Sequence, residues 1–453
     1  MKILIADIYP NLNHRLIKDT AGGYGTGNDF SSNFFLSFLN NFLGSMLSMP
    51  PMSAIYTYSI LKRKGHDVDY IKTTKDAYVN DNYDVYIIPS SIIAFESELE
   101  FIKNIVSRGK TIFVIGVFSN IKSEDYDKKT VVVKGEPEKF FLENNLNEII
   151  NDEKILKEKA NLNGKIEELD SLPFPYWNEY LKKYKLKNNF LDYNSLPAIP
   201  IQFSRGCPYS CFNYCTYPLQ QGRKVRYRSI KNVVDEIESL NDLYGYKKFV
   251  FRDPVFSINR SKTIDLCDEI IRRNIKISFL IETHLNNLDE DLIKKLSKAG
   301  LKMVYVGIES SDDKVLDNMK RFSISSDKQY SLIKLLKDNG IITKSMFMLG
   351  NPADSKKTIS NTIKYAKYLP NELVQFSVFT PYPGTPIYDS YKTKITTKKM
   401  EDFNQYNLVF DHKYLKAKDI NWLKLKAYYQ VYLPKKFFVI IKCLVSFFRW
   451  KIF

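Results

Sequence analysis

The sequence predicts an α/β protein with three parts: an N-terminal doubly wound parallel sheet of Rossmann-like type, a partial (β/α)6 TIM-type barrel and a helical C-terminal segment. Short apolar runs alternate with helical patterns along most of the chain, which is the order that parallel sheets require. The length of 453 residues is enough for two or three domains that each bury a core. We expect domains at residues 1–160 and 196–395, a linker at 161–195 and a C-terminal extension at 396–453.

The first domain contains four nearly continuous apolar runs, which we predict to be strands buried on both faces of a sheet. Two helical patterns between them end at Gly65 and Gly109, as helices with a glycine C-cap do. Ligands of such sheets bind beyond the carboxyl ends of the strands, here in the loops after Ile8, Pro89 and Gly116. The predicted strands are residues 3–8, 67–71, 84–89 and 111–116, and the predicted helices are residues 52–64 and 96–108.

Three further segments in this half of the chain have distinctive compositions. Residues 21–27 are rich in glycine and predict a flexible loop that closes over a ligand. Because these glycines do not open a helix directly after a strand, a phosphate-binding loop is not favoured. Residues 131–138 predict a last strand and turn, and residues 169–177, with two prolines, mark the passage to the next domain.

The second domain repeats a strand and helix unit six times, which predicts a partial parallel barrel. In such barrels the residues at the carboxyl ends of the strands carry the chemistry. A cysteine-rich loop follows the first strand, and Asp253, Glu282, Glu309 and Gly350-Asn351-Pro352 follow the next four. The predicted strands are residues 198–203, 248–252, 276–282, 303–308, 343–349 and 373–379, with helices at 229–244, 262–273, 290–299, 326–339 and 356–369.

Three of the five cysteines, Cys207, Cys211 and Cys215, lie within nine residues of one another in this loop. Three thiols so close together can bind one soft metal centre and leave a coordination position open for a molecule that is not protein. A structural zinc site normally has four ligands, and no histidine or fourth cysteine lies near the loop. A disulfide framework is typical of short secreted chains with an even number of cysteines. The pattern favours a three-thiolate iron–sulfur site, with zinc, redox thiols and simple packing as alternatives.

Glu282 and Glu309 recur at the same end of successive predicted strands. Carboxylates at buried strand ends are costly unless they meet a cation or hydrogen-bond donors. The recurrence favours a ligand with an amine and hydroxyl groups, and a structural salt bridge is the alternative.

Taken together, the motifs resemble the radical S-adenosylmethionine (SAM) superfamily. Within it, the sequence is most similar to members with an N-terminal cobalamin-binding-like domain. The resemblance covers roughly residues 1–395, and motifs that occur jointly and in order are far more specific than any one of them. The motifs are Pro50-Pro51, Gly65–Val68, Lys134–Glu138, the cysteine loop, Phe251–Phe256, Val306–Ser310, Met319–Arg321, Met348–Pro352 and Thr380–Pro386.

The resemblance implies a mechanism. The three cysteines would hold a 4Fe-4S cluster, whose open iron binds the amino and carboxylate groups of SAM. One electron from the reduced cluster would cleave SAM to methionine and a 5′-deoxyadenosyl radical, which abstracts hydrogen from the substrate. By motif position, Asp253, Glu282, Glu309 and Arg321 would bind the cofactor, and Tyr214 would lie near the adenine of SAM.

The sequence departs from the family pattern at two places. The usual spacing is Cys-x3-Cys-x2-Cys, whereas the interval between Cys211 and Cys215 is one residue longer. We expect an extra bulge in the loop and a cluster that still binds. Pro254 stands where many relatives carry a second acid.

The sequence does not decide whether the N-terminal domain binds cobalamin. Proteins that replace the lower ligand of cobalamin with histidine carry Asp-x-His-x2-Gly after the first strand, and Asp7-Ile8-Tyr9-Pro10 lacks that histidine. The glycine pair after the fourth strand is replaced by Gly116-Val117. Related enzymes without the histidine still bind the cofactor, and a degenerate structural domain is the alternative.

Charge and the first residues constrain the partners and the compartment. The formal charge of +16 arises from 67 Lys and Arg against 51 Asp and Glu, spread along the chain, so we do not expect nucleic acid as a partner. The N-terminal apolar run predicts a first strand and no secretion signal, which indicates the reducing cytosol, where an oxygen-sensitive cluster survives. The expected partners are a small-molecule or lipid-linked substrate and an electron donor such as flavodoxin or ferredoxin.

The last twenty residues are apolar but are interrupted by Lys442 and Arg449, so no stretch is long enough to span a bilayer. Lysines and Trp450 suit a membrane surface, and a helix packed on the barrel is the alternative. We therefore expect a cytoplasmic protein with peripheral contact at the inner face of the membrane.

The hypothesis from the sequence is a radical SAM enzyme that methylates or rearranges an unactivated carbon of an organic substrate. The first alternative is a tRNA-modifying radical SAM enzyme, which the net charge favours but for which no RNA-binding module is evident. The second is a non-catalytic iron–sulfur or scaffold protein whose altered loop no longer supports turnover.

Overall fold

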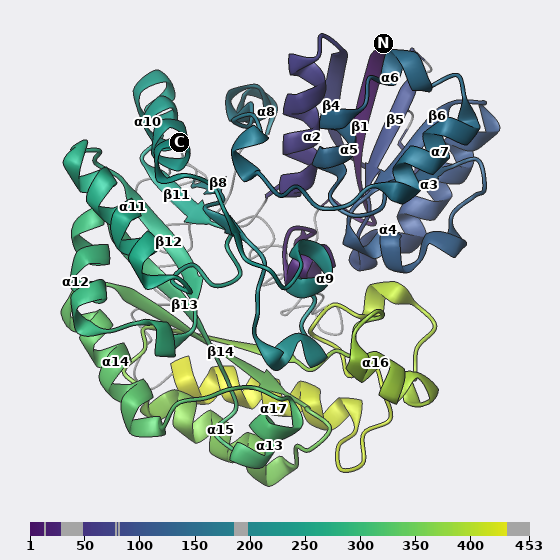
Figure 1. Cartoon of the computed structure of the whole chain (residues 1–453). Helices are drawn as coiled ribbons and strands as arrows, with labels where there is room; N and C mark the ends of the chain where they lie inside the picture. The colour runs from purple at the N-terminus through teal and green to yellow at the C-terminus, as the bar shows by residue number, and fades with distance from the viewer. Residues whose placement is uncertain (13–14, 29–48, 78, 80–81, 185–197, 433–453) are drawn as a thin grey trace, which may run out of the picture.

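The computed structural model describes residues 1–12, 15–28, 49–77, 79, 82–184 and 198–432. Two parallel sheets organise these residues, and Figure 1 shows the N-terminal sheet at the upper right and the second sheet curving down the left side. The fold class that the sequence predicts is confirmed. Residues 434–453, for which the sequence predicts contact with a membrane or with the barrel, lie outside the described residues. Helix α17 comes before that segment.

The N-terminal sheet has the strand order β4-β1-β5-β6-β7, and all of its strands are parallel. Its central strands are almost completely buried, because helices cover both faces. The strands are β1 (Lys2–Tyr9), β4 (Asp67–Thr74), β5 (Val85–Pro89), β6 (Thr111–Ile115) and β7 (Val131–Val132), and the helices are α2 (Met52–Arg63), α3 (Phe95–Ser107), α4 (Val117–Ile121), α5 (Pro137–Glu143), α6 (Leu146–Ile149) and α7 (Glu153–Leu162).

The second sheet has six parallel strands in the order β15-β14-β13-β12-β11-β8, so neighbouring strands follow one another along the chain. That order is the one a partial barrel requires, and helices cover its outer face (Figure 1). The strands are β8 (Ile199–Ile201), β11 (Lys248–Phe251), β12 (Ser278–Thr283), β13 (Leu301–Glu309), β14 (Ile342–Leu349) and β15 (Leu373–Val378), and the helices are α10 (Ile230–Tyr244), α11 (Arg260–Arg272), α12 (Glu290–Ala299), α13 (Asp313–Asn318), α14 (Ser326–Asp338), α15 (Lys356–Tyr368) and α16 (Pro386–Tyr391).

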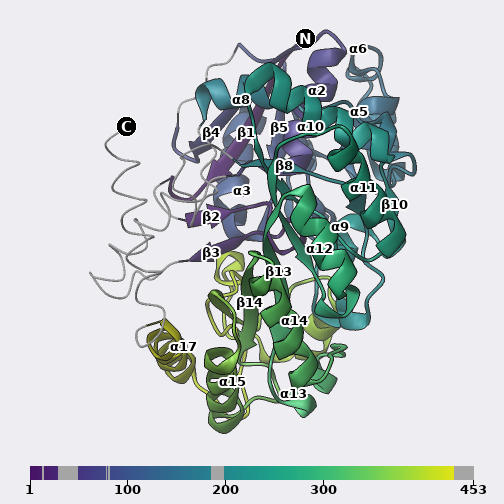
Figure 2. The same ribbon diagram turned by 90° about the vertical axis from the view of Figure 1, so that its left-hand side faces the viewer.

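The glycine-rich segment does not form the flexible loop that the sequence predicts. Strands β2 (Arg15–Ile17) and β3 (Thr26–Asn28) form a hairpin around the short helix η1 (Ala21–Gly23). Figure 2 shows the hairpin between the N-terminal sheet and strands β13 and β14. Tyr24 is fully buried in the apolar core of the N-terminal domain, and this burial fixes the segment in place.

The end of the described chain protects the free edge of the second sheet. Helix α17 (Ala417–Tyr432) runs beside β15, with its yellow ribbon at the bottom of Figure 1. The hydroxyl of Tyr432 accepts a hydrogen bond from the Val374 N–H at 2.8 Å, and that of Tyr428 accepts one from the Phe376 N–H at 3.1 Å. Since an unpaired strand edge invites association with other chains, these tyrosines take the place of a further strand.

The predicted linker contains helix α8 (Trp177–Lys183), which packs on the N-terminal sheet through Tyr180 and the ring of Tyr70 on β4. In the parts of the chain that the structure describes, no helix combines the length and apolarity that a membrane span needs.

A carboxyl pair joins the C-terminal part to the N-terminal domain. Glu401, on the short helix η8 (Met400–Asp402), lies near Glu96 on α3, whose carboxylate accepts a hydrogen bond from the Met400 N–H at 2.8 Å. Burial and the Glu96 carboxylate raise the pKa of Glu401 to about 8. The pKa is higher in the folded state than in an unfolded chain, so the fold loses stability as the pH rises from about 4.5 through 8.

We therefore expect Glu401→Gln to raise the thermal midpoint at pH 8 and to leave it nearly unchanged at pH 5. Differential scanning fluorimetry across this pH range measures the effect. An equal shift at both pH values would contradict a protonated Glu401 in the folded protein.

Candidate cluster and cofactor site

The cysteine loop begins where strand β8 ends. Strand β9 (Ser204–Arg205) pairs with β10 (Arg226–Tyr227), and the loop between them holds all three candidate cysteines. Gly206 has a φ of +109°, and a Cβ atom on it would lie 2.2 Å from the Lys224 carbonyl oxygen. Only glycine therefore fits at the turn that aims the chain into the loop.

The extra residue between Cys211 and Cys215 is accommodated in one turn of helix, η5 (Ser210–Asn213). The Cys215 N–H donates to the Cys211 carbonyl oxygen at 3.0 Å, so the two side chains lie one helical turn apart on the same side. Cys207 and Cys211 are buried and Cys215 is half-buried, and none of the three forms a disulfide. The Cys-x3-Cys spacing thus keeps the last two thiols next to each other.

Of the three cysteines in the loop, Cys211 ionises most easily. A hydrogen bond from the Cys215 thiol and the nearby Arg321 guanidinium, whose Nη1 lies 3.9 Å from Cys211 Sγ, lower the pKa of Cys211 to about 6. Burial raises the pKa of Cys207 to about 11, and the hydrogen bond to Cys211 raises that of Cys215. The described residues contain no group of three His, Cys, Asp or Glu side chains arranged around a single ion. The cysteines of a cluster bind different irons and so stand further apart than the ligands of one ion.

Asp253, at the end of β11, is buried and binds the start of the cysteine loop. Its carboxylate accepts hydrogen bonds from the Phe203 N–H at 3.1 Å, from the Ser204 hydroxyl at 2.6 Å and from the Ser204 N–H. Burial raises the pKa of Asp253 to about 6 despite these donors. Asp253 therefore positions the strand that leads into the loop.

The side chains of Glu309 and Arg321 lie close together at the end of β13. Glu309 has a φ of +66°, and the pairing of β13 with β14 shifts register between Gly307 and Glu309. A non-glycine residue in this conformation costs about 1–3 kcal/mol and is typical of functional sites. Arg321 Nη2 donates to the Gly307 carbonyl oxygen at 2.7 Å, and burial, opposed by Arg321, raises the pKa of Glu309 to about 7.

Glu282, on β12, is half-buried beside this pair, and burial raises its pKa although Arg252 and Arg321 oppose the shift. Tyr214 is buried next to Cys215, with its ring centroid 6.1 Å from that of Phe379 after β15. The structure thus brings the cysteines, Tyr214, Glu282, Glu309 and Arg321 to one end of the barrel, whereas the Asp253 carboxylate faces the start of the loop.

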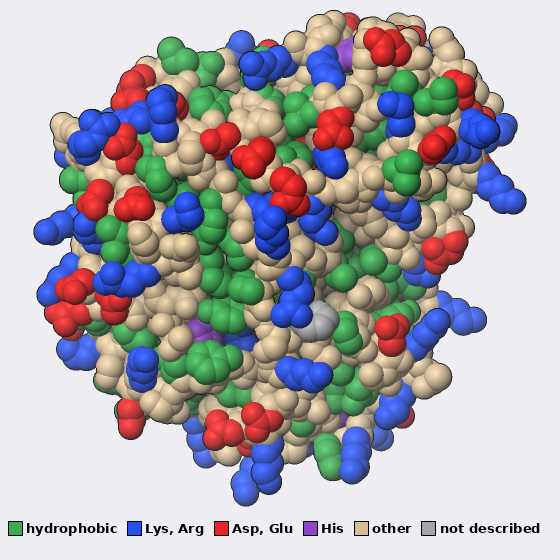
Figure 3. Space-filling model, in the orientation of Figure 1, with side chains coloured by type: hydrophobic (Ala, Val, Ile, Leu, Met, Phe, Trp, Pro, Cys, Tyr) green, Lys and Arg blue, Asp and Glu red, His purple; other side chains and the backbone are tan. Residues whose placement is uncertain are grey.

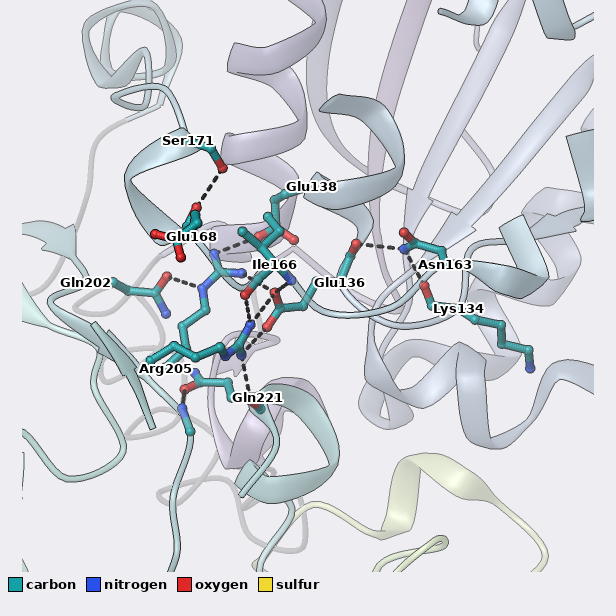
Figure 4. Close-up of polar contacts among 12 residues, drawn as sticks. Lys134, Glu136, Glu138, Asn163, Ile166, Glu168, Ser171, Gln202, Arg205 and Gln221 are labelled. Carbon is teal, nitrogen blue, oxygen red and sulfur yellow. Dashed lines mark hydrogen bonds and ion pairs between the residues drawn. The ribbon is translucent and has the colours of Figure 1, made fainter. Parts of the chain in front are cut away.

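A buried ionic cluster, which sequence reasoning did not single out as a unit, ties the cysteine loop to the N-terminal domain (Figure 4). Arg205, two residues before Cys207, pairs with Glu138 at 3.0 Å and Glu136 at 3.4 Å. Arg226 pairs with Glu136 at 2.7 Å. Although Glu136 is buried, Arg205 and Arg226 hold its pKa below the usual value. The Lys134–Glu138 motif in the sequence was the available signal, but nothing in it named Arg205 as the partner.

A pocket opens between the two domains, and Arg205, Glu136 and Glu138 of this cluster form part of its wall. Met52, Gly116 and Val117 also line it from the N-terminal domain, and Tyr217 and Arg252 line it from the barrel side. Its cavity volume is about 50 Å³, and one side of it is open to solvent.

The comparison with known families identifies the central domain. The model of the Radical SAM superfamily matches residues 201–366, which include the cysteine loop, Glu282, Glu309 and Arg321. Residues 201–366 are a radical SAM domain. Three comparisons extend beyond the domain itself.

An uncharacterised methyltransferase of Pyrococcus horikoshii is 29% identical over 280 residues, which are 61% of this chain and 59% of that protein. The chain therefore spans only part of this relative's length. The bacteriochlorophyllide d C-12(1)-methyltransferase of Chlorobaculum tepidum is 24% identical over 375 residues, or 81% of this chain and 79% of that one. The cobalamin-dependent SAM radical enzyme OxsB, solved with aqua-cobalamin and SAM bound, superposes with a TM-score of 0.65 and 13% identity over 99% of this chain and 72% of its own. This structural likeness establishes a common fold for both domains.

Proposed function

We propose that the protein is a radical SAM enzyme that methylates an unactivated carbon of a small-molecule or lipid-linked substrate. The radical SAM domain with three free cysteines in one loop carries the proposal. Methyl transfer is favoured over rearrangement because three of the relatives that align along much of this chain are methyltransferases by name and a fourth is a methylthiotransferase by name.

The residues at the loop fit a 4Fe-4S cluster and SAM. Cysteine thiolates are the ligands of such clusters, and Arg321 favours the ionised form of Cys211. When bound, the cluster supplies the electron that cleaves SAM. Glu309 and Glu282 supply carboxylates for the amino and hydroxyl groups of SAM, while Arg321 supplies a guanidinium for its carboxylate. Tyr214 and Phe379 supply an aromatic surface for the adenine.

Relatives with this fold hold cobalamin, and we propose that a corrin ring binds between the domains by widening this pocket, whose cavity of about 50 Å³ is smaller than such a ligand. Corrin rings carry amide side chains, and the pocket offers Arg205, Gln220, Gln221 and Arg252 as polar partners. Its described walls come from both domains, so the ionic cluster of Arg205 with Glu136 and Glu138 would set the width of the pocket.

Labelled SAM tests the reaction. With SAM that carries deuterium in its methyl group, we expect the label in a product other than methionine, formed by the reduced wild-type protein and not by Cys211→Ala. A substrate-derived product, other than 5′-deoxyadenosine, that lacks the label but depends on Cys211 would replace methylation by rearrangement.

The ionisation of Glu309 predicts a pH dependence of SAM binding. A carboxylate binds an ammonium group by charge only when ionised, and its hydrogen bonds to hydroxyl groups are stronger in that form, while the pKa of Glu309 is about 7. We expect the affinity for SAM to fall by up to about tenfold for each pH unit below 7. Glu309→Gln should bind weakly at pH 8 and show a flat pH profile, which isothermal titration calorimetry measures. Glu290→Gln, on the exposed start of α12, is the control, and a flat wild-type profile would remove Glu309 from the SAM site.

The remaining partners follow from the chemistry. The cluster needs a one-electron donor, for which we propose a flavodoxin or ferredoxin, and an oxygen-sensitive cluster calls for the reducing cytoplasm. Figure 3 shows Lys and Arg side chains interspersed with Asp and Glu on one face of the molecule and no single basic patch there, which supports a substrate other than nucleic acid.

We also propose peripheral contact with the inner face of the membrane through α17 and the segment after it. The outer face of α17 exposes Trp422 (63%), Leu425 (42%) and Tyr429 (65%), beside Lys418. Aromatic and basic side chains together suit the headgroup region of anionic lipids. We expect the full chain to float with anionic liposomes and a form that ends at Leu433 to float less. Equal flotation of both forms would remove the C-terminal segment from this role.

A further inference from the structure

The N-terminal sheet has a defined ligand position that follows from its strand order. In the order β4-β1-β5-β6-β7 the direction of winding reverses between β1 and β5. Sheets of this kind bind nucleotides beyond the carboxyl ends of the two strands at that reversal. Here these ends are Tyr9 on β1 and Pro89 on β5.

A side chain of this protein occupies that position. Lys18, which follows β2, is 1% exposed, and its Nζ donates to the Pro89 carbonyl oxygen at 2.8 Å. The same Nζ lies 2.7 Å from Glu98 on α3 and 3.1 Å from Asp7 on β1. One buried ammonium thus joins both strands at the reversal.

The rest of the segment closes the space around Lys18. The Tyr24 carbonyl oxygen accepts a hydrogen bond from the Ile92 N–H at 3.0 Å, just beyond the end of β5. The Tyr24 ring meets Phe118 edge-on at 5.5 Å, and its hydroxyl donates to the Pro383 carbonyl oxygen at 2.6 Å. The segment is therefore bound to the N-terminal domain and to the loop after β15.

The other side of the segment is fixed to the radical SAM domain. Asp19 pairs with Arg252 at 3.0 Å, and the Thr216 hydroxyl, one residue after Cys215, donates to the Ala21 carbonyl oxygen at 2.5 Å. A Cβ atom on Gly22 would lie 2.6 Å from the Thr216 carbonyl carbon, and Gly22 has a φ of +56°. Displacing the segment would break these contacts and leave the Asp7 and Glu98 carboxylates buried without their cation.

We infer that residues 17–25 form an internal plug that closes the nucleotide position of the N-terminal sheet. Cobalamin consists of a corrin ring and a nucleotide tail, and the tail is the part that such a position would take. Resting on the function proposed above, the inference is that this protein binds a corrinoid between the domains by its ring alone, because the N-terminal sheet has no site left for the nucleotide tail.

Cobinamide, which lacks the nucleotide tail, tests the inference with the wild-type full chain. Absorbance titrations with aqua-cobalamin and with cobinamide should give dissociation constants within about threefold of each other. A dissociation constant for cobalamin more than tenfold lower than that for cobinamide would contradict the plug. Absence of binding by both compounds would remove the corrinoid from the proposed function and would contradict this inference with it, whereas tight binding of cobalamin alone would contradict only the inference.

Hydrogen exchange gives a second readout that does not depend on activity. The amide N–H groups of Gly23, Tyr24 and Gly25 donate to carbonyl oxygens within the plug, so we expect slow exchange that saturating cobalamin leaves unchanged. Faster exchange at these amides on addition of cobalamin would show that the plug opens for the tail, and would contradict the inference.

Discussion

Replacing any one of Cys207, Cys211 and Cys215 with alanine is expected to abolish a stable cluster. Anaerobic reconstitution of the wild-type protein should give about four irons per chain with the broad absorbance of a 4Fe-4S cluster. Each variant should retain a minor fraction of this iron, because two thiolates cannot hold the cluster against chelators. Iron and sulfide analysis after gel filtration measures the difference.

Cys267→Ala is the matched control. Cys267 is also buried and free, but it lies on α11 in the apolar core, away from the loop. The Cys267→Ala variant should retain the wild-type iron content. Loss of iron from this variant alone, or full retention by Cys211→Ala, would contradict the assignment of the three loop cysteines.

Arg205→Ala is expected to destabilise the protein strongly. It would leave Glu138 and Glu136 buried with a missing partner, and breaking a buried ion pair costs about 3–5 kcal/mol. The thermal midpoint should fall by on the order of 10 °C. Because Arg205 lies two residues before Cys207, the variant should also lose iron faster during chelator treatment.

Lys224→Ala provides the comparison for the ionic cluster. Lys224 lies on the same loop and pairs with Glu167 at 2.8 Å, but both side chains are exposed. Exposed ion pairs contribute little to the free energy of unfolding, so this variant should have the same thermal midpoint as the wild type. Equal melting of both variants would mean that the ionic cluster does not hold the domains together.

The sequence predicted the elements that depend on local patterns. Apolar runs predicted the strands of both sheets, and the recurrence of carboxylates at strand ends predicted that Glu282 and Glu309 would lie at one end of the barrel. The cysteine spacing suggested a bulge, and the structure has the helical turn η5 instead, because an x3 interval matches one turn of helix.

The contacts between distant segments could not be predicted in this way. Arg205 and Glu138 are separated by 67 residues, and their pairing depends on how the two domains close on each other. Lys18 and Glu98 are separated by 80 residues within the N-terminal domain, and their pairing depends on how that domain folds. Asp253 shows the same limit with partners 49 and 50 residues away in the sequence. Its place at a strand end suggested a cofactor contact, but the Ser204 side chain and two N–H groups engage its carboxylate.

The most direct test of the account is the cleavage of SAM itself. The reconstituted protein, reduced with dithionite under anaerobic conditions and supplied with SAM, should release 5′-deoxyadenosine, which liquid chromatography with mass spectrometry quantifies. Cys211→Ala should release none, and Cys267→Ala should match the wild type. A wild-type protein with a complete cluster and bound SAM that forms no 5′-deoxyadenosine would contradict the assignment of this site as a radical SAM active site.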